Sequence, residues 1–103
     1  METKDVIKDL VHFRNERGWQ EFHTLESLSR ALGIEASEVE KIFLWKNNDA
    51  QLSDKEREAL ILEVADVLTY AYYMCEELGV DPNAIVEKKL AINQKRHWNF
   101  EEK

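Results

Sequence analysis

The stretch from residue 59 to residue 75 constrains this chain most, because it is apolar almost throughout and too long for an ordinary strand. Its only charged residues are Glu63 and Asp66. A helix with so little polar surface is buried at the centre of a fold or in a subunit interface. The stretch is also shorter than the ~20 residues that a bilayer requires. We therefore expect a central helix that carries two carboxylates in apolar surroundings.

The rest of the chain also shows helical spacing of apolar residues, and no strand-like alternation is sustained. Gly79 marks a helix end, Asp81 followed by Pro82 marks a helix start, and Ser53 with Glu56 forms a capping box. These signals predict four helices, at about residues 3–17, 24–46, 53–78 and 82–98. We expect residues 1–103 to form a single all-α domain, a four-helix bundle with short connections.

Charge and composition narrow the class of protein. The chain holds 21 acidic and 14 basic residues, and its net charge of −7 disfavours binding to nucleic acid or to an anionic membrane surface. Cys75 is the only cysteine, which excludes an internal disulfide and a cysteine-based zinc site and suits a reducing compartment. The first residues carry charges throughout, unlike a secretory signal peptide. We expect a cytoplasmic protein with no membrane segment.

Four carboxylates fall where a helix should be apolar or half-buried. They form two pairs at i, i+3 spacing: Glu35 with Glu38, and Glu63 with Asp66. Residues at this spacing project side by side, and two antiparallel helices can bring both pairs together. Such a group would repel itself strongly unless divalent cations neutralise it. Because the donors are all oxygen, the set favours Mg²⁺, with Mn²⁺ as a substitute, over zinc or iron.

A plainer interpretation of these pairs stays open. Acidic residues at i, i+3 are common on solvated helices, and Glu40 and Lys41 indicate a wet side for the second helix. Arg30 or Lys41 could form salt bridges with the first pair. The plainer interpretation explains Glu63 and Asp66 less well, because their neighbours leave that helix no wet face.

The ordered set of motifs resembles the MazG-like all-α nucleoside triphosphate pyrophosphohydrolases. That family carries E-x-x-E, a spacer and E-x-x-D, which here are residues 35–38 and 63–66. Three flanking segments match as well: an aromatic and histidine segment, the apolar close of the second helix, and a K-L…N…R pattern in the last helix. In this sequence they are residues 13–17 with Trp19, Phe22 and His23; residues 43–45; and Lys89, Leu90, Asn93 and Arg96.

The resemblance implies an activity and a role for each group of residues. The family hydrolyses a nucleoside triphosphate between the α and β phosphates, giving a nucleoside monophosphate and pyrophosphate, in the housekeeping of nucleotide pools. The four carboxylates would hold Mg²⁺ on the phosphate chain and supply catalysis. The polar residues of the last helix would contact phosphate; they are Lys89, Asn93 and Arg96. The aromatic segment would line a pocket for the base, with Trp19, Phe22 and His23.

Two departures from the family pattern fall in the segments that flank the acid motifs. Thr24 follows His23 where members often carry a Pro-Lys pair, which removes one cation from that loop. His97 and Trp98 follow Arg96 where Tyr-Pro is common, which leaves the base preference open. Neither change touches the acid pairs.

Self-association is expected from the apolar third helix. A lone small bundle cannot easily cover it, so we expect a homodimer or a dimer of dimers. The resemblance also implies that each site borders a subunit interface. Tyr70, Tyr72 and Tyr73 are interpreted as core or dimer contacts.

A second class of protein is a helix-turn-helix DNA-binding regulator built on residues 28–45. Gly33 would lie at the turn, and the recognition helix would begin near Ala36. The acidic residues of this segment, Glu35, Glu38 and Glu40, would then face phosphates, where Lys and Arg are needed. This alternative also leaves the acids of the third helix unexplained.

Overall fold

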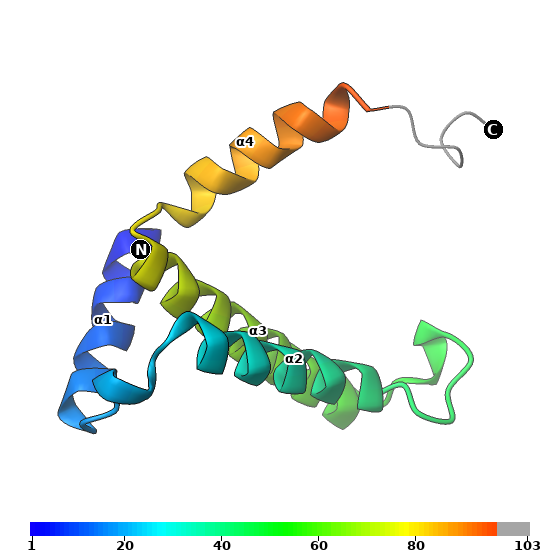
Figure 1. The fold of residues 1–103 in the computed structure, drawn as a ribbon. Coiled ribbons are helices and arrows are strands. Elements are labelled where there is room, and N and C mark those ends of the chain that lie inside the picture. Colours follow the sequence, from blue (N-terminus) through cyan, green and yellow to red (C-terminus); the bar gives the residue numbers. More distant parts are fainter. Residues whose placement is uncertain (97–103) are drawn as a thin grey trace.

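The computed structural model describes residues 1–96, which form helices joined by short connections (Figure 1). Four α-helices follow one another: α1 (Thr3–Glu16), α2 (Leu25–Lys41), α3 (Asp54–Leu78) and α4 (Pro82–Gln94). Two short 3₁₀ turns, η1 (Gln20–Phe22) and η2 (Asp49–Gln51), precede α2 and α3. No strand occurs among the described residues, so the prediction of an all-α fold with four helices is confirmed. His97 and the helix end expected near Trp98 lie outside the described residues.

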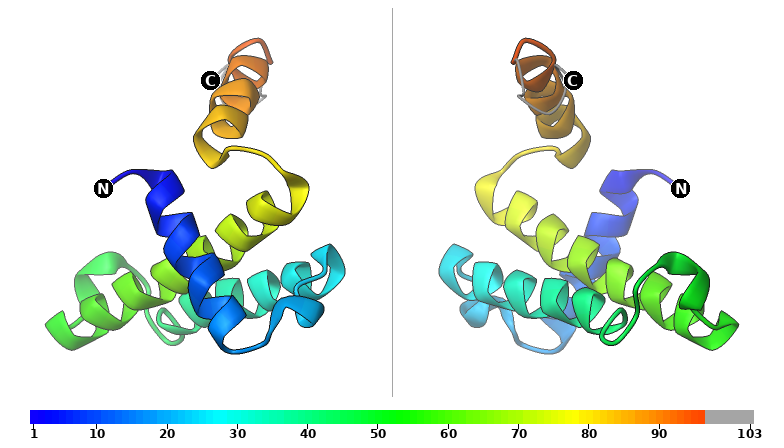
Figure 2. Two further views of the ribbon diagram at one scale, coloured as in Figure 1. Left: turned by 90° about the vertical axis from the view of Figure 1, so that its left-hand side faces the viewer. Right: turned by 90° about the vertical axis from the view of Figure 1, so that its right-hand side faces the viewer.

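α2 and α3 run antiparallel and form the main packing unit, and α1 packs across α3 (Figures 1 and 2). The core is small, and its most buried apolar side chains are Leu28, Tyr73 and Cys75. α3 is the central helix, as expected, but one copy of the chain leaves part of it uncovered, and Leu62 is 65% exposed. Within residues 1–96, no helix combines the length and the apolar character needed to cross a bilayer.

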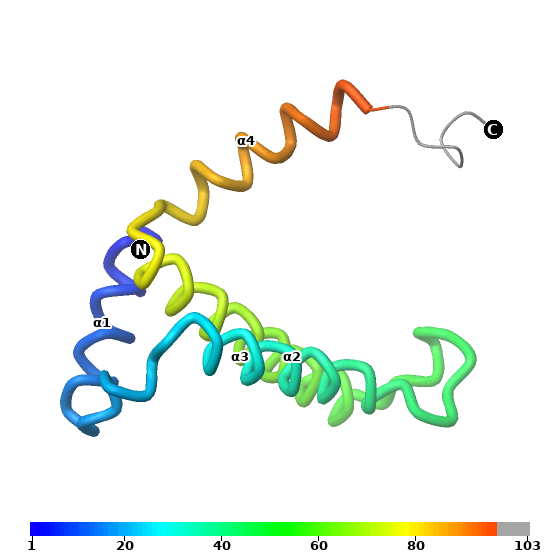
Figure 3. Tube along the Cα trace, viewed as in Figure 1, coloured from blue at the N-terminus to red at the C-terminus, as the bar shows by residue number. Residues whose placement is uncertain are grey.

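Only the N-terminal end of α4 adjoins this unit, and the rest of the helix extends away from α2 and α3 (Figures 1 and 3). The radius of gyration is 16.7 Å, whereas a compact domain of this length has about 13 Å. The apolar side chains of α4 are consequently uncovered, and Val86 is 64% exposed. The fourth helix exists as predicted, but within one chain it stands apart from the other three.

The direction of α4 is fixed by the junction with α3. Gly79 ends α3 in the left-handed conformation, with φ of +67°, which a glycine adopts without strain. Asp81 caps α4, because its side chain accepts a hydrogen bond from the Ala84 N–H at 2.8 Å. Asn83 Nδ2 then donates to Thr3 Oγ1 of α1 at 3.3 Å. These contacts anchor only the first turn of α4.

α2 is one continuous helix. It begins at the N-cap Thr24, whose Oγ1 accepts from the Ser27 N–H at 3.1 Å, and it runs unbroken through Gly33. A helix-turn-helix needs a turn there, so that interpretation is wrong. α2 also ends at Lys41, earlier than the expected residue 46. The N–H groups of residues 42–44 donate to carbonyls three residues back rather than four. The apolar segment after Lys41 therefore forms tight turns in place of a last α-helical turn.

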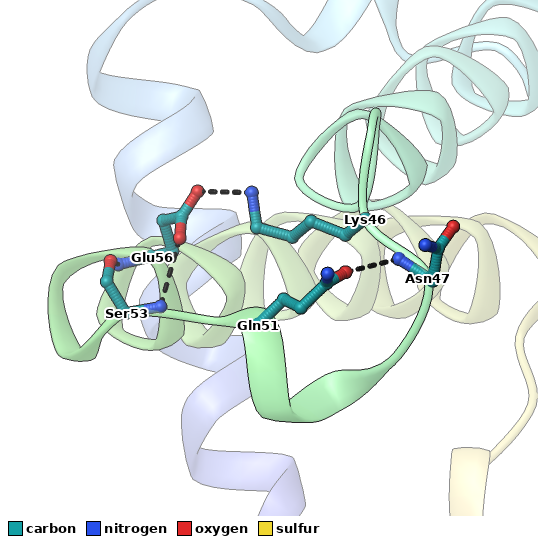
Figure 4. A network of polar contacts seen from close by, with 5 residues as sticks. All are labelled: Lys46, Asn47, Gln51, Ser53 and Glu56. Atoms are coloured by element: carbon teal, nitrogen blue, oxygen red, sulfur yellow. Dashed lines mark hydrogen bonds and ion pairs between the residues drawn. The ribbon is translucent and has the colours of Figure 1, made fainter.

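The connection from α2 to α3 is held by a polar network (Figure 4). Lys46 Nζ lies 2.6 Å from Glu56 Oε2 across the connection. Glu56 also completes the predicted capping box, because its N–H donates to Ser53 Oγ at 3.0 Å and its carboxylate accepts from the Ser53 N–H at 2.9 Å. The Asn47 N–H donates to the side chain of Gln51. The network fixes where α3 begins relative to the end of α2.

The variant Glu56→Gln tests this network through its pH dependence. The hydrogen bonds from Lys46 and from the Ser53 N–H lower the pKa of Glu56 from 4.5 to about 2. A carboxyl whose pKa is depressed in the folded state stabilises the fold above its unfolded pKa, and this stabilisation is lost as pH falls through the folded pKa. We therefore expect Glu56→Gln to melt below wild type at pH 7, with the difference shrinking between pH 4.5 and pH 2, in thermal unfolding followed by circular dichroism.

The matched control is Glu58→Gln, which changes an exposed glutamate on the same helix. It should melt close to wild type at every pH. An equal loss in both variants would show that the network contributes nothing specific.

Candidate functional site

The antiparallel packing of α2 on α3 brings three carboxylates together. One oxygen each of Glu35, Glu63 and Asp66 lies within 4.8 Å of the others. We call these three residues the acidic cluster. Glu35 and Glu63 are half-buried, and Asp66 is exposed. The structure thus juxtaposes three of the four acids that the sequence singled out, while their chemical role stays a prediction.

The members of the acidic cluster repel one another. The pKa of Glu35 is raised above its ordinary value, first by partial desolvation and then by the charges of Asp66, Glu63 and Glu38. A bound divalent cation would reverse this effect, because it favours the ionised carboxylate. Oxygen donors at this separation are the ligands that hard divalent cations take in proteins. The residues present therefore fit a metal site.

Glu38, the fourth predicted acid, lies beside the acidic cluster. Its charge contributes to the raised pKa of Glu35, but its oxygens are outside the set that lies within 4.8 Å. Glu38 Oε1 accepts from Lys41 Nζ at 3.2 Å, so one of the salt bridges considered for the first pair is present. Arg30 pairs instead with Glu26, at 2.7 Å on an exposed surface, where an ion pair stabilises little.

A narrow pocket joins the acidic cluster to a group of aromatic side chains. Its volume is about 160 Å³, and it is lined by Glu35, Asp66, Leu10, Phe13, Trp19, His23, Thr69, Tyr70 and Tyr73. A wider hollow of about 330 Å³ shares part of this lining; its residues are Trp19, Phe22, His23, Ser27, Leu28, Ala31 and Tyr70. The three residues predicted to contact a base thus lie together, next to the predicted metal ligands.

His23 lies at the wall that both pockets share. Burial first, and then the charge of Arg14, lower the pKa of His23, so its imidazole is neutral at pH 7. Its ring meets Tyr73 edge-on, with centroids 4.4 Å apart, and the Tyr73 hydroxyl donates to the Leu10 carbonyl at 2.8 Å. His23 Nδ1 is buried without a hydrogen-bond partner among residues 1–96. An unpaired buried nitrogen is costly, so a ligand that pairs with it would gain affinity.

Sequence reasoning missed part of this lining. Thr69 was not considered, and Tyr70 and Tyr73 were assigned to packing alone. They follow Asp66 by three, four and seven positions, so helical periodicity places them on the same face as the acid. That spacing could have identified these three residues as part of the pocket lining. Tyr73 is also buried, so a packing role holds for it as well.

The predicted phosphate-binding residues are elsewhere. Lys89 and Asn93 lie on α4, and Arg96 follows its last turn. Because α4 extends away from α2 and α3, one copy of the chain does not bring these residues to the acidic cluster (Figure 1).

Comparison with known proteins places this arrangement in a family. The sequence profile of the MazG-like family matches residues 30–103, which contain both acid pairs and α4. The chain belongs to the MazG-like family. The match covers more than half of the sequence and includes all four predicted metal ligands.

Individual relatives agree with this assignment. Human dCTP pyrophosphatase 1 is 33% identical over 98 residues, which cover 91% of this chain and 58% of that protein. The enzyme of the same name from Rattus norvegicus is 33% identical over 99 residues, with the same coverage. This MazG-like chain therefore spans a little over half the length of the curated relatives it matches. A pyrophosphatase of known structure from Archaeoglobus fulgidus DSM 4304 superposes with a TM-score of 0.83 at 27% identity, covering 89% of this chain and 88% of that one.

Metal binding to the acidic cluster can be measured without substrate. A cation that binds only the folded protein stabilises it by about 3 kcal/mol at a concentration a hundredfold above its Kd. We expect Mg²⁺ and Mn²⁺ to raise the melting temperature of the wild type by several degrees, and Glu63→Gln to lose this shift.

Glu40→Gln, on the exposed side of α2, is the matched control and should keep the shift. A wild-type protein whose melting temperature does not respond to either cation would contradict a metal site at the acidic cluster.

Proposed function

We propose that this protein hydrolyses nucleoside triphosphates, ribose or deoxyribose, between the α and β phosphates, releasing a nucleoside monophosphate and pyrophosphate. The observation that carries the proposal is the single pocket in which Glu35 and Asp66 adjoin aromatic side chains. A triphosphate needs cationic neutralisation at one end and an apolar, stacking surface at the other. The pyrophosphatases among the relatives support this assignment. Housekeeping of nucleotide pools in the cytoplasm is the role we propose.

Mg²⁺ is the cofactor we propose, with Mn²⁺ as a substitute, held by Glu35, Glu63 and Asp66. When bound, the metal supplies charge neutralisation on the phosphate oxygens and a lowered pKa for an attacking water. By holding that cation, the three carboxylates would position the phosphates that bind to it. Glu38 lies beside them with its oxygens outside the cluster, and it can accept the proton of the attacking water.

The base is recognised, in this proposal, by Trp19, Phe22 and His23. Phe22 and Trp19 are 63% and 42% exposed, so they offer aromatic surface for stacking. The neutral His23 ring has one nitrogen that donates and one that accepts, so it can pair with the polar edge of a base. Because the curated relatives are named for dCTP, dCTP is the first substrate to test.

Self-association completes the proposal. α3 leaves Ile61, Leu62 and Leu68 exposed, and α4 leaves Val86 and Leu90 exposed. Large exposed apolar surfaces mark sites of interaction with a partner. We propose a homodimer or a dimer of dimers, with Lys89, Asn93 and Arg96 available to the phosphates.

The test is a panel of ribo- and deoxyribonucleoside triphosphates with Mg²⁺, scored for monophosphate and pyrophosphate. We expect wild type to produce both in equal amounts. Glu63→Gln should lower kcat/KM at least a hundredfold, because it removes a ligand of the metal.

Glu40→Gln serves as the control and should stay within a factor of two or three of wild type, as is usual for an exposed substitution away from a site. Release of inorganic phosphate in place of pyrophosphate would refute cleavage between the α and β phosphates.

A further inference from the structure

The segment from residue 18 to residue 23 supplies the three side chains proposed to contact the base. It begins where α1 ends, at Gly18, whose φ of +69° lies in the left-handed region that glycine adopts without strain. The Gly18 N–H donates to the Asn15 carbonyl at 3.1 Å, and the Trp19 N–H donates to the Arg14 carbonyl at 3.1 Å. These two bonds form a Schellman motif, which turns the chain sharply out of a helix. The backbone of Trp19 is therefore tied to the last turn of α1.

The side chain of Trp19 is held as well as its backbone. Its indole ring meets the ring of Phe13 edge-on, with centroids 5.5 Å apart, which is the apolar contact that frequently accompanies a Schellman motif. The Arg17 guanidinium lies over the Phe13 ring, 4.8 Å from its centroid, and it lies 6.0 Å from the centroid of the Trp19 ring. At these distances a cation is attracted to an aromatic face. Phe13 and Arg17 together restrain the indole ring.

Arg17 stands behind the site rather than in it. Trp19 lines both pockets of the site and Phe13 lines the narrower one, whereas Arg17, among the described residues, lines neither. Trp19 is 42% exposed, so much of its ring faces solvent and not the core. Ordering a mobile side chain at the moment of binding costs affinity. The contacts with Phe13 and Arg17 reduce this cost, because they order the ring before a ligand arrives.

The backbone passes this restraint on to the other two residues of the segment. The Trp19 carbonyl accepts from the Phe22 N–H at 2.9 Å, and the His23 N–H donates to the Gln20 carbonyl at 3.1 Å. These bonds close the turn η1, and the Thr24 cap of α2 fixes the far end of the segment. The path of the whole segment is thus set from both ends, and the end at Trp19 depends on contacts with α1.

We propose that Arg17 is a positioning residue for base recognition. Together with Phe13, it holds the indole ring of Trp19 in place for a base to stack on, and it does so without touching the nucleotide. The inference rests on the proposed function for the role of Trp19. Because the restraint acts on binding and lies away from the acidic cluster, its loss weakens nucleotide binding and leaves the chemical step unchanged.

Steady-state kinetics with the best substrate of the nucleotide panel tests this role. Arg17→Gln removes the cation from an exposed position, so the fold tolerates it, and it should raise KM about threefold at unchanged kcat. Phe13→Leu/Arg17→Gln removes both ring contacts and should raise KM about tenfold. Arg57→Gln, which changes an exposed arginine in the first turns of α3, is the matched control and should leave KM as it is.

The same change in a Trp19→Ala background separates positioning from direct contact. Without the indole ring Arg17 has nothing to position, so Arg17→Gln should add no further rise in KM there. An equal rise in both backgrounds would overturn the inference, and so would an unchanged KM for Arg17→Gln in the presence of Trp19. A wild type that is inactive on the whole panel would refute the proposed function instead, and the restraint on the ring is then decided by a second measurement.

That measurement is the fluorescence of Trp19 in the variant Trp45→Phe/Trp98→Phe, which leaves Trp19 as the only tryptophan. Adding Arg17→Gln should lower the fluorescence anisotropy and raise quenching by acrylamide, because the indole ring then moves more freely on the nanosecond timescale. Adding Arg57→Gln should change neither quantity. Equal anisotropy and quenching with and without the Arg17 guanidinium would overturn the positioning role.

Discussion

The packing of α2 against α3 holds three carboxylates at close range and so sets the position of the candidate site. Glu35 faces Glu63 and Asp66 because apolar packing holds the two helices in one register, although the three charges would be more stable apart. Two of the three side chains are half-buried, so water solvates their charges incompletely. The fold therefore keeps a local electrostatic cost that a bound divalent cation would relieve, as functional sites often do at the expense of stability.

The site has oxygen donors on one side and aromatic side chains on the other, which suits the phosphates and the base of a nucleotide. Oxygen donors gather where α2 meets α3, and the aromatic side chains come from α1, from the turn before α2 and from the next turns of α3. His23 links the two regions, because it is neutral and carries a buried nitrogen that no described residue satisfies. The negative net charge of the chain thus agrees with a phosphate ligand, provided that the phosphates arrive with metal.

Local chemistry made much of the fold predictable. The Ser53 capping box, the left-handed Gly79 and the Asp81 cap each depend on residues within a few positions, so the sequence indicated them directly. The acidic cluster was predictable because the i, i+3 spacing limits which face each acid takes. The end of α2 was misplaced, because the apolar residues 42–45 suit tight turns as well as a helix. The Lys46–Glu56 pair and the direction of α4 depend on distant parts of the chain, and no local pattern encodes them.

The position of a bound metal decides whether the acidic cluster is a metal centre. Crystals grown with Mn²⁺ and a non-hydrolysable deoxynucleoside triphosphate analogue allow the metal to be located by its anomalous scattering. We expect a peak between the carboxylates of Glu35, Glu63 and Asp66, with the phosphates of the analogue on the same metal. A metal bound elsewhere, or phosphates bound away from these three residues, would contradict this expectation.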